Sequence, residues 1–287
     1  MENINPTNSN NQFDTISISD EEFNLMRQLI YSSSGISLSE QKKSLVVGRL
    51  QKVLKKHSLN NFKDYYNELL NDRSGALLTE LIDNISTNHT FFGRESDHFN
   101  YFQNTVLPEI IGKKIESSDY DIRVWCAGCS TGEEPYTLVI IMKEFFKNDY
   151  NKWKSGVLAT DISTTVLSKA IQGIYDPVKF KGFNAEWLRK YFKQIDENKL
   201  EINSDIKSEV LFRRFNLISS NYNFKKPFDI IFCRNVMIYF DKETRTKVVQ
   251  NLYNSLDFGG YLFIGHAETI DRTKSKFQYI APSIYKK

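Results

Sequence analysis

A glycine-containing segment near the middle of the 287-residue chain holds the first side chains that could do chemistry. It runs Ala127-Gly128-Cys129-Ser130-Thr131-Gly132 and continues as Glu133-Glu134-Pro135-Tyr136. Glycines let a ligand approach the backbone closely, whereas adjacent carboxylates repel phosphate and suit a cationic ligand. The segment has neither Gly-x-Gly-x-x-Gly nor Gly-Lys-Ser/Thr, which weakens a dinucleotide hypothesis and excludes a phosphate-binding loop. S-adenosylmethionine, which bears an ammonium and a sulfonium, fits better; alternatively, the two glutamates only favour the start of a helix.

Asp161 is the next candidate, because it closes the apolar run Val157-Leu158-Ala159-Thr160. An acid at the end of such a strand commonly accepts hydrogen bonds from ribose hydroxyls. The alternative is a helix cap, since Ser163 and Thr164 follow. Both roles can coexist in neighbouring residues.

The cysteines and histidines argue against redox and metal chemistry. Cys126 and Cys129 have redox-motif spacing, but they stand at a strand end without a thioredoxin-like context. Three cysteines cannot form a disulfide framework. We predict no metal, because no metal-ligand spacing relates the four histidines to one another or to cysteine: His57, His89, His98 and His266.

Strand patterns alternate with helical patterns after residue 120. The strands are expected at 122–127, 157–161, 228–233 and 261–264, and the helices at 133–146, 163–171 and 242–256. This alternation predicts a parallel sheet covered on both faces. Ligands of such sheets bind beyond the carboxyl ends of the strands, where the glycine segment and Asp161 both stand.

The pattern breaks between the second of these helices and residue 215. A short helix is expected at 185–192. Residues 200–203 and 209–212 alternate like two strands of a small antiparallel ribbon. We therefore predict a β-subdomain inserted at about residues 177–214.

The first part of the chain predicts a small all-α domain over residues 18–86, followed by a linker with a helix over 87–119. Ser19 and Glu22 fit a capping box, and Gly35 would end the first helix. Further helices are expected at 40–57, 62–70 and 76–85. Residues 1–17 are rich in Asn, Ser and Thr, which predicts a disordered tail.

Four basic residues share one face of the expected helix 40–57, away from its apolar positions. They form either a solvated face or a docking surface for an acidic partner. We call them the basic stripe: Lys42, Arg49, Lys52 and Lys56.

The composition is that of an ordinary globular protein, with 40% hydrophobic and 25% charged residues and a net charge of +3. That charge does not indicate nucleic acid, and no nucleic-acid module is recognisable. No apolar run reaches the roughly eighteen residues of a membrane helix, and the N-terminus does not resemble a secretory signal. We therefore expect a cytoplasmic protein that neither binds nucleic acid nor inserts directly into a membrane. We also expect a monomer.

Several strings of residues closely resemble the chemotaxis receptor methyltransferase family (CheR). Asn88-His89-Thr90-Phe91-Phe92-Gly93-Arg94 is similar to the family's Asn-x-Thr-x-Phe-Phe-Arg, with Gly93 replacing a Phe. Gly265-His266-Ala267-Glu268 stands where the family usually has Gly-His-Ser-Glu. The other matching strings are Gly132-Glu133-Glu134-Pro135-Tyr136, Ala159-Thr160-Asp161-Ile162 and Phe232-Cys233-Arg234-Asn235-Val236-Met237-Ile238-Tyr239-Phe240.

The resemblance implies a helical N-terminal domain, a linker, and a Rossmann-like S-adenosylmethionine-dependent methyltransferase domain over residues 120–287 that carries a small antiparallel β-subdomain. It also implies the reaction, which is methyl transfer from S-adenosylmethionine to glutamate side chains on bacterial chemoreceptors, with S-adenosylhomocysteine as product. The basic stripe would then dock the receptor.

The resemblance also implies site residues, position by position. Asn88, Thr90 and Arg94 would line the cofactor from the linker side. Glu134, or its neighbour Glu133, would contact the methionine ammonium end. The other implied cofactor contacts are Asp161 at the ribose, Asn216 and Leu217 at the adenine, and Arg234 with Asn235 completing the site.

Arg94 and Tyr239 are the implied catalytic residues. A glutamate has a pKa of about 4.3, so it is already a carboxylate at neutral pH and needs no general base. Arg94 would steer that carboxylate, and Tyr239 would position it by a hydrogen bond. The alternatives are a methyltransferase for another acceptor and a non-catalytic module that senses the cofactor; retention of both residues favours catalysis.

Overall fold

The computed structural model describes residues 16–287, which form two compact units. Of the described residues, unit 1 contains 16–29 together with Leu38–Ile85, and unit 2 contains Ile30–Ser37 and Ser86–Lys287. The tail predicted for residues 1–17 lies outside the described residues, except for its last two. Of these, Ile16 exchanges backbone hydrogen bonds of 3.1 and 2.6 Å with the side chain of Gln51.

The described part of unit 1 is helical, as predicted. Its helices are α1 (Asp20–Ser34), α2 (Lys43–Lys56), α3 (Phe62–Asn71) and α4 (Ala76–Ile85), with a 3₁₀ turn over Glu40–Lys42. Only the part of α1 up to Leu29 belongs to unit 1. The predicted capping box is present, since Glu22 N donates to Ser19 Oγ (3.1 Å) and Ser19 N donates to Glu22 Oε2 (2.8 Å). The apolar faces meet in a core that includes Met26, Val46, Leu50, Leu54, Phe62 and Leu81.

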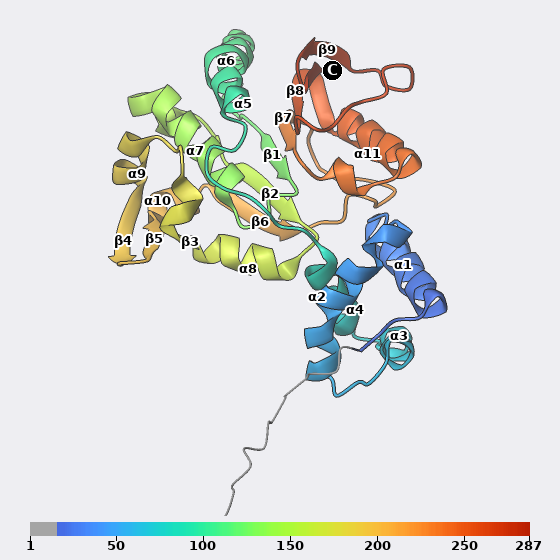
Figure 1. Cartoon of the computed structure of the whole chain (residues 1–287). Helices are drawn as coiled ribbons and strands as arrows, with labels where there is room; N and C mark the ends of the chain where they lie inside the picture. The colour runs from blue at the N-terminus through green and yellow to red at the C-terminus, as the bar shows by residue number, and fades with distance from the viewer. Residues whose placement is uncertain (1–15) are drawn as a thin grey trace, which may run out of the picture. The chain divides into compact units, whose positions relative to one another are not determined.

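A 7-stranded mixed sheet forms the centre of unit 2 (Figure 1). The strands β6, β2, β1, β7 and β8 run parallel, and β10 and β9 are added antiparallel. In spatial order they are β6 (Val210–Arg214), β2 (Val157–Asp161), β1 (Val124–Ala127), β7 (Phe228–Cys233), β8 (Leu256–Ile264), β10 (Ile284–Lys286) and β9 (Gln278–Ala281).

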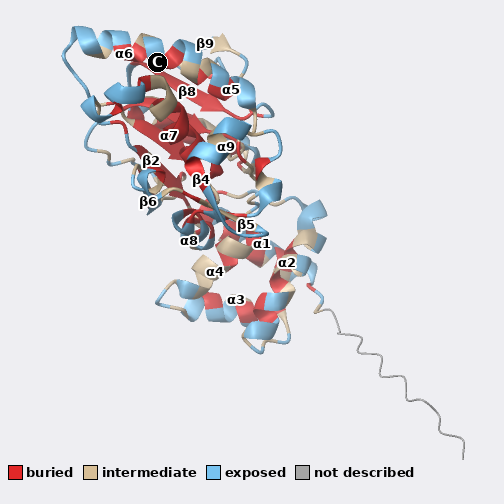
Figure 2. Cartoon of the chain, turned by 90° about the vertical axis from the view of Figure 1, so that its left-hand side faces the viewer, coloured by how far each residue is buried: buried red, intermediate tan, exposed pale blue. Residues whose placement is uncertain are grey.

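Helices cover both faces of this sheet, because alternate strand residues point to opposite sides. Val124 and Cys126 belong to one apolar cluster with α7 (Glu133–Phe146), α5 (Ser96–Tyr101) and α6 (Leu107–Glu116). Trp125 and Ala127 belong to a second cluster with α11 (Lys242–Ser255). Figure 2 shows β2, β8 and α7 mainly as buried, and the outer faces of the surrounding helices as exposed.

The predicted ribbon is partly wrong. Residues 210–214 form β6, which joins the edge of the main sheet beside β2 with Val157 opposite Val210. The small antiparallel sheet has the order β3-β5-β4 instead, from β3 (Ile174–Tyr175), β5 (Lys199–Ile202) and β4 (Phe192–Asp196). Its strands precede residue 203, so residues 209–214 do not belong to the inserted subdomain. The prediction failed because the alternating burial of β6 is compatible with an edge strand of either sheet. Periodicity in the sequence does not identify the strand with which it pairs.

The remaining helices connect these layers. α8 (Thr164–Gln172) follows β2, and α9 (Ala185–Tyr191) and α10 (Ser204–Lys207) flank the small sheet. A π-helical turn over Phe102–Val106 joins α5 to α6. Within residues 16–287 no helix combines the length and apolarity needed to cross a membrane.

Candidate functional site

The glycine segment leaves β1 in a conformation that needs glycine. Gly128 has φ 85°, and a Cβ built there would lie 2.3 Å from Val236 Cγ2. Its backbone N–H donates to Thr160 O of β2 (2.7 Å). The segment is therefore held closely against the carboxyl end of β2 and the loop that follows β7.

Asp161 fixes the same segment from the end of β2. Its carboxylate accepts hydrogen bonds from Ser130 N (2.8 Å) and Ser163 N (3.0 Å), and the residue is 8% exposed. The cap of α8 is Ser163, whose hydroxyl accepts from Val166 N (3.3 Å). Asp161 therefore joins two ligand-side loops, and its predicted contact with a ribose stays a prediction.

The two adjacent glutamates differ in their surroundings. Glu133 is fully buried, and its carboxylate accepts from the Thr131 hydroxyl (2.7 and 2.9 Å) and lies 3.2 Å from Lys179 Nζ. The Glu134 side chain keeps 16% exposure, accepts from the Cys126 thiol (3.0 Å) and lies 2.9 Å from Arg234 Nη1. Glu134 is thus the better candidate for a cationic ligand, because its side chain keeps some exposure whereas Glu133 is fully buried.

Arg234 joins the loop after β7 to two carboxylates. Its guanidinium lies 2.9 Å from Glu134 and 3.1 Å from Glu95, and Glu95 also accepts from the side-chain amide of Asn235 (3.0 Å). Burial alone would raise the pKa of Glu95, but the Arg234 charge and the Asn235 hydrogen bond outweigh it and hold that pKa below its usual range. The Arg234 guanidinium is therefore shared between a linker carboxylate and a carboxylate of α7.

Glu268 holds the loop that bears the predicted catalytic tyrosine. Its buried carboxylate accepts backbone hydrogen bonds from Asn235 (2.9 Å), Ile238 (3.2 Å) and Gly265 (2.5 Å). Tyr239 ends the 3₁₀ turn Met237–Tyr239 in this loop and is half-buried. The loops after β7 and β8 are therefore one connected piece.

The linker residues lie against these loops. The Ser130 hydroxyl donates to Asn88 O (3.4 Å), and Arg234 Nη2 donates to Arg94 O. The half-buried Arg94 donates from Nη1 to His89 O (2.7 Å). Gly93, which departs from the family pattern, has φ 75°, a conformation that favours glycine.

Lys179 was not identified from the sequence. Its Nζ donates to Thr90 O (2.6 Å) and approaches Glu133, so it ties the linker to α7. Phe92 of the linker stacks on the neighbouring Phe180, with ring centroids 4.6 Å apart. A lysine in the segment between β3 and β4 gave no sequence signal for this role.

Asn216 and Leu217 follow β6 beside the end of β2. The preceding residue, Phe215, donates its backbone N–H to Asp161 O (2.9 Å). The Asn216 amide donates to Ser33 O (2.8 Å), and Leu217 is 7% exposed in the apolar cluster that contains α11. Their place near Asp161 suits the predicted adenine contact, which stays a prediction.

Two histidines that are far apart in the sequence meet beside Glu95. One ligand atom from each of Glu95, His98 and His266 lies within 4.8 Å of the others. His98 is buried, and its ring nitrogens have no hydrogen-bond partner among the described residues. Burial, and after it the nearby Arg234 charge, lower the pKa of His98 to about 4. Sequence spacing missed this cluster, and whether it holds a metal stays open to test.

The cysteines lie at the strand ends as predicted. All three, Cys126, Cys129 and Cys233, are buried free thiols. Burial raises the pKa of each well above its usual value, and nearby carboxylates raise it further. Thiols of this kind are poor nucleophiles.

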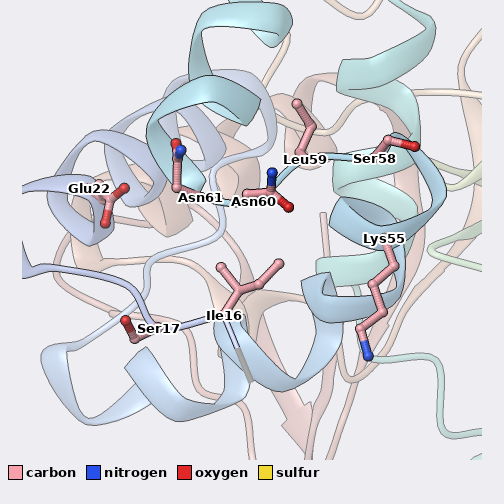
Figure 3. A pocket seen from close by; sticks show the side chains of 8 residues that line it. All are labelled: Ile16, Ser17, Glu22, Lys55, Ser58, Leu59, Asn60 and Asn61. Carbon is pink, nitrogen blue, oxygen red and sulfur yellow. The ribbon is translucent and has the colours of Figure 1, made fainter. Parts of the chain in front are cut away.

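The basic stripe lies in unit 1, where Lys42 ends the 3₁₀ turn Glu40–Lys42 and the other three residues are on α2. Lys42, Lys52 and Lys56 are exposed. Arg49 donates to Ile85 O, and Lys56 Nζ lies 2.8 Å from Glu80. A separate hollow of about 700 Å³ in unit 1 is lined by polar side chains that include Glu22, Lys55 and Asn61 (Figure 3). No stripe residue lines that hollow.

Comparisons with known proteins cover nearly the whole chain. The model of the CheR methyltransferase all-alpha domain matches residues 21–86, and that of the CheR methyltransferase SAM binding domain matches residues 88–285. The chain is similar to the chemotaxis protein methyltransferase of Borreliella burgdorferi, with 41% identity over 98% of this chain and 99% of the relative. It is also similar to that of Escherichia coli, with 33% identity over 94% of this chain and 92% of the relative.

Proposed function

Because the chain belongs to the CheR methyltransferase family, we propose that it methylates glutamate side chains of bacterial chemoreceptors. The coarser activity, S-adenosylmethionine-dependent methyl transfer in chemotaxis, follows from the family. The products of the proposed reaction are a glutamate methyl ester and S-adenosylhomocysteine. The geometry that supports it most is the partly open carboxylate of Glu134, fixed by Arg234 beside the glycine segment.

The residues present fit S-adenosylmethionine. Glu134 offers negative charge to the ammonium group, and Asp161 at the end of β2 offers a carboxylate to the ribose hydroxyls. Gly128, where a Cβ would overlap Val236, lets the loop after β7 pack closely on the glycine segment. The other proposed contacts are Asn88, Thr90 and Arg94 from the linker, Asn216 and Leu217 at the adenine, and Arg234 and Asn235.

When bound, S-adenosylmethionine supplies an activated methyl group on a sulfonium. The protein's contribution is alignment and exclusion of water. Arg94 orients the acceptor carboxylate, and Tyr239, held by the loop that Glu268 fixes, positions it by a hydrogen bond. A carboxylate oxygen forms the new bond to the methyl carbon, and the electron pair of the broken carbon–sulfur bond stays on sulfur. Because the acceptor is already a carboxylate at neutral pH, no general base is needed.

The test uses the whole protein, methyl-labelled S-adenosylmethionine and the purified cytoplasmic part of a chemoreceptor. We expect label on the receptor that alkali releases as methanol, because carboxyl methyl esters hydrolyse under those conditions. Label that resists alkali would indicate another acceptor group. Binding of S-adenosylmethionine without any transfer would favour a non-catalytic sensor and overturn the proposal.

A further inference from the structure

A cleft of about 250 Å³ lies between the first turns of α11 and the loop that follows Glu268. Val249 and Ile270 are its apolar lining residues, and side chains with hydroxyl or charged groups form the rest of its wall. Its polar lining residues are Lys242, Arg245, Thr246, Thr269, Asp271, Lys274 and Ser275.

Positive charge exceeds negative charge in this cleft. Lys242, Arg245 and Lys274 face one acid, Asp271. Asp271 Oδ1 is already occupied by the backbone and hydroxyl of Thr273 (3.1 and 2.6 Å), and Lys242 Nζ lies 4.0 Å from Oδ2. The buried Nε of Arg245 has no hydrogen-bond partner among the described residues. The donors that the lining offers to an anion are the exposed ammonium groups of Lys242 and Lys274.

Helix stability does not explain why two of these cationic residues stand at the start of α11. Lys242 and Arg245 stand in the first turn of α11, where the helix dipole is positive and favours acids rather than bases. Asp241 already caps that end by accepting from Thr244 N (2.8 Å). The two cations therefore act against the local electrostatics of the fold, as expected of groups placed for a ligand.

The cleft is joined to the loop that carries Tyr239. Arg245 Nη2 donates to Phe240 O (3.3 Å), directly after Tyr239. Glu268, which holds the tyrosine loop, precedes the cleft residue Thr269. A group bound in the cleft is therefore held at a fixed position relative to the tyrosine.

We propose that this cleft binds a second carboxylate of the methyl-accepting polypeptide, an Asp or Glu side chain near the glutamate that is methylated. This inference rests on the proposed function, because it needs an acidic polypeptide as acceptor. Cationic side chains and hydroxyls bind the second carboxylate, which raises affinity for acceptors that carry neighbouring acids and leaves the methyl-transfer step unchanged.

The test compares Lys242→Gln/Lys274→Gln with wild type in receptor methylation. Both lysines are exposed, so the fold should be unaffected. We expect the KM for the receptor fragment to rise about tenfold, as for loss of one charge-assisted interaction, with kcat and S-adenosylhomocysteine affinity unchanged. The matched control is Lys225→Gln/Lys226→Gln, which removes two exposed lysines before β7, at the opposite strand end; its KM should stay within about twofold.

A receptor fragment whose acids next to the methylated glutamate are replaced by Gln should abolish the difference between wild type and the cleft variant. Arg245→Gln provides a second variant, whose folding is checked by its thermal midpoint. If wild type methylates the receptor and the cleft variants have an unchanged KM, this inference alone is overturned. If wild type transfers no methyl group to the receptor, the proposed function and this inference fail together.

Discussion

Arg234 Nη1, in the loop after β7, lies 2.9 Å from a carboxylate oxygen of Glu134 in the first turn of α7. The same guanidinium lies 3.1 Å from Glu95, and the Arg234 side chain is 2% exposed. One buried cation thus holds the linker, the glycine segment and the tyrosine loop around the proposed cofactor site.

Replacing Arg234 should be costly for stability and for cofactor binding. In Arg234→Met two partly buried carboxylates lose their counter-ion, so we expect a loss of about 3–5 kcal/mol in the free energy of unfolding. Urea denaturation measures this loss, and calorimetry measures weaker binding of S-adenosylhomocysteine. Arg234→Lys keeps the charge and should lose less. An unchanged urea midpoint in Arg234→Met would contradict the structural role.

Asp161→Asn should weaken S-adenosylmethionine binding by about 1–3 kcal/mol, because one acceptor oxygen of the proposed ribose contact is lost. Ser163→Ala is the matched control, since it removes the cap of α8. The control should lose about 1 kcal/mol of stability but keep its cofactor affinity. Equal affinities for Asp161→Asn and wild type, measured by calorimetry, would leave Asp161 as a structural residue of the loop.

Arg94→Ala should lower turnover far more than stability. Arg94 is half-buried and its side chain makes one described hydrogen bond, to His89 O, so loss of that side chain should cost about 1 kcal/mol in unfolding free energy. We expect kcat for receptor methylation to fall about 100-fold if Arg94 orients the acceptor. Arg94→Lys, which retains the charge, should recover part of that loss. A normal rate in Arg94→Ala would refute the assignment.

If the basic stripe docks the receptor, its neutralisation should slow binding of the receptor. Neutralising all four residues should reduce the methylation rate at low receptor concentration and its salt dependence. Lys42→Gln/Lys52→Gln isolates the docking effect, because Arg49 and Lys56 also hold Ile85 O and Glu80 within unit 1. Single exposed charges contribute only about 0.2–1 kcal/mol, so the double variant is the smallest useful change. Identical salt slopes for the double variant and wild type would identify the stripe as a solvated face.

Removing metal ions should leave activity and stability unchanged. Glu95, His98 and His266 lie close together, but both Glu95 oxygens already accept from Arg234 and Asn235. We therefore expect dialysis against EDTA to alter neither the methylation rate nor the thermal midpoint. A loss that added Zn²⁺ restores, and that His98→Gln abolishes, would show that this cluster holds a metal after all.

The sequence alone was sufficient to predict the main helices and strands of the fold. Three features depend on local patterns: the capping residues Ser19 and Glu22, the buried face of α2, and the apolar strands of the parallel sheet. Local patterns can be recognised from the spacing of residues along the chain. The motif strings likewise identified the family, and with it the positions of the proposed site residues.

The tertiary structure decided what those patterns leave open. The alternation in residues 209–212 was visible, but pairing with β2 rather than with the small sheet depends on a distant strand. The two adjacent glutamates look alike in sequence, and only the approach of Lys179 and Arg234 distinguishes Glu133 from Glu134. The meeting of His98 and His266, and the cationic cleft beside α11, also depend on long-range contacts. Such contacts are set by packing between distant segments, which residue spacing does not encode.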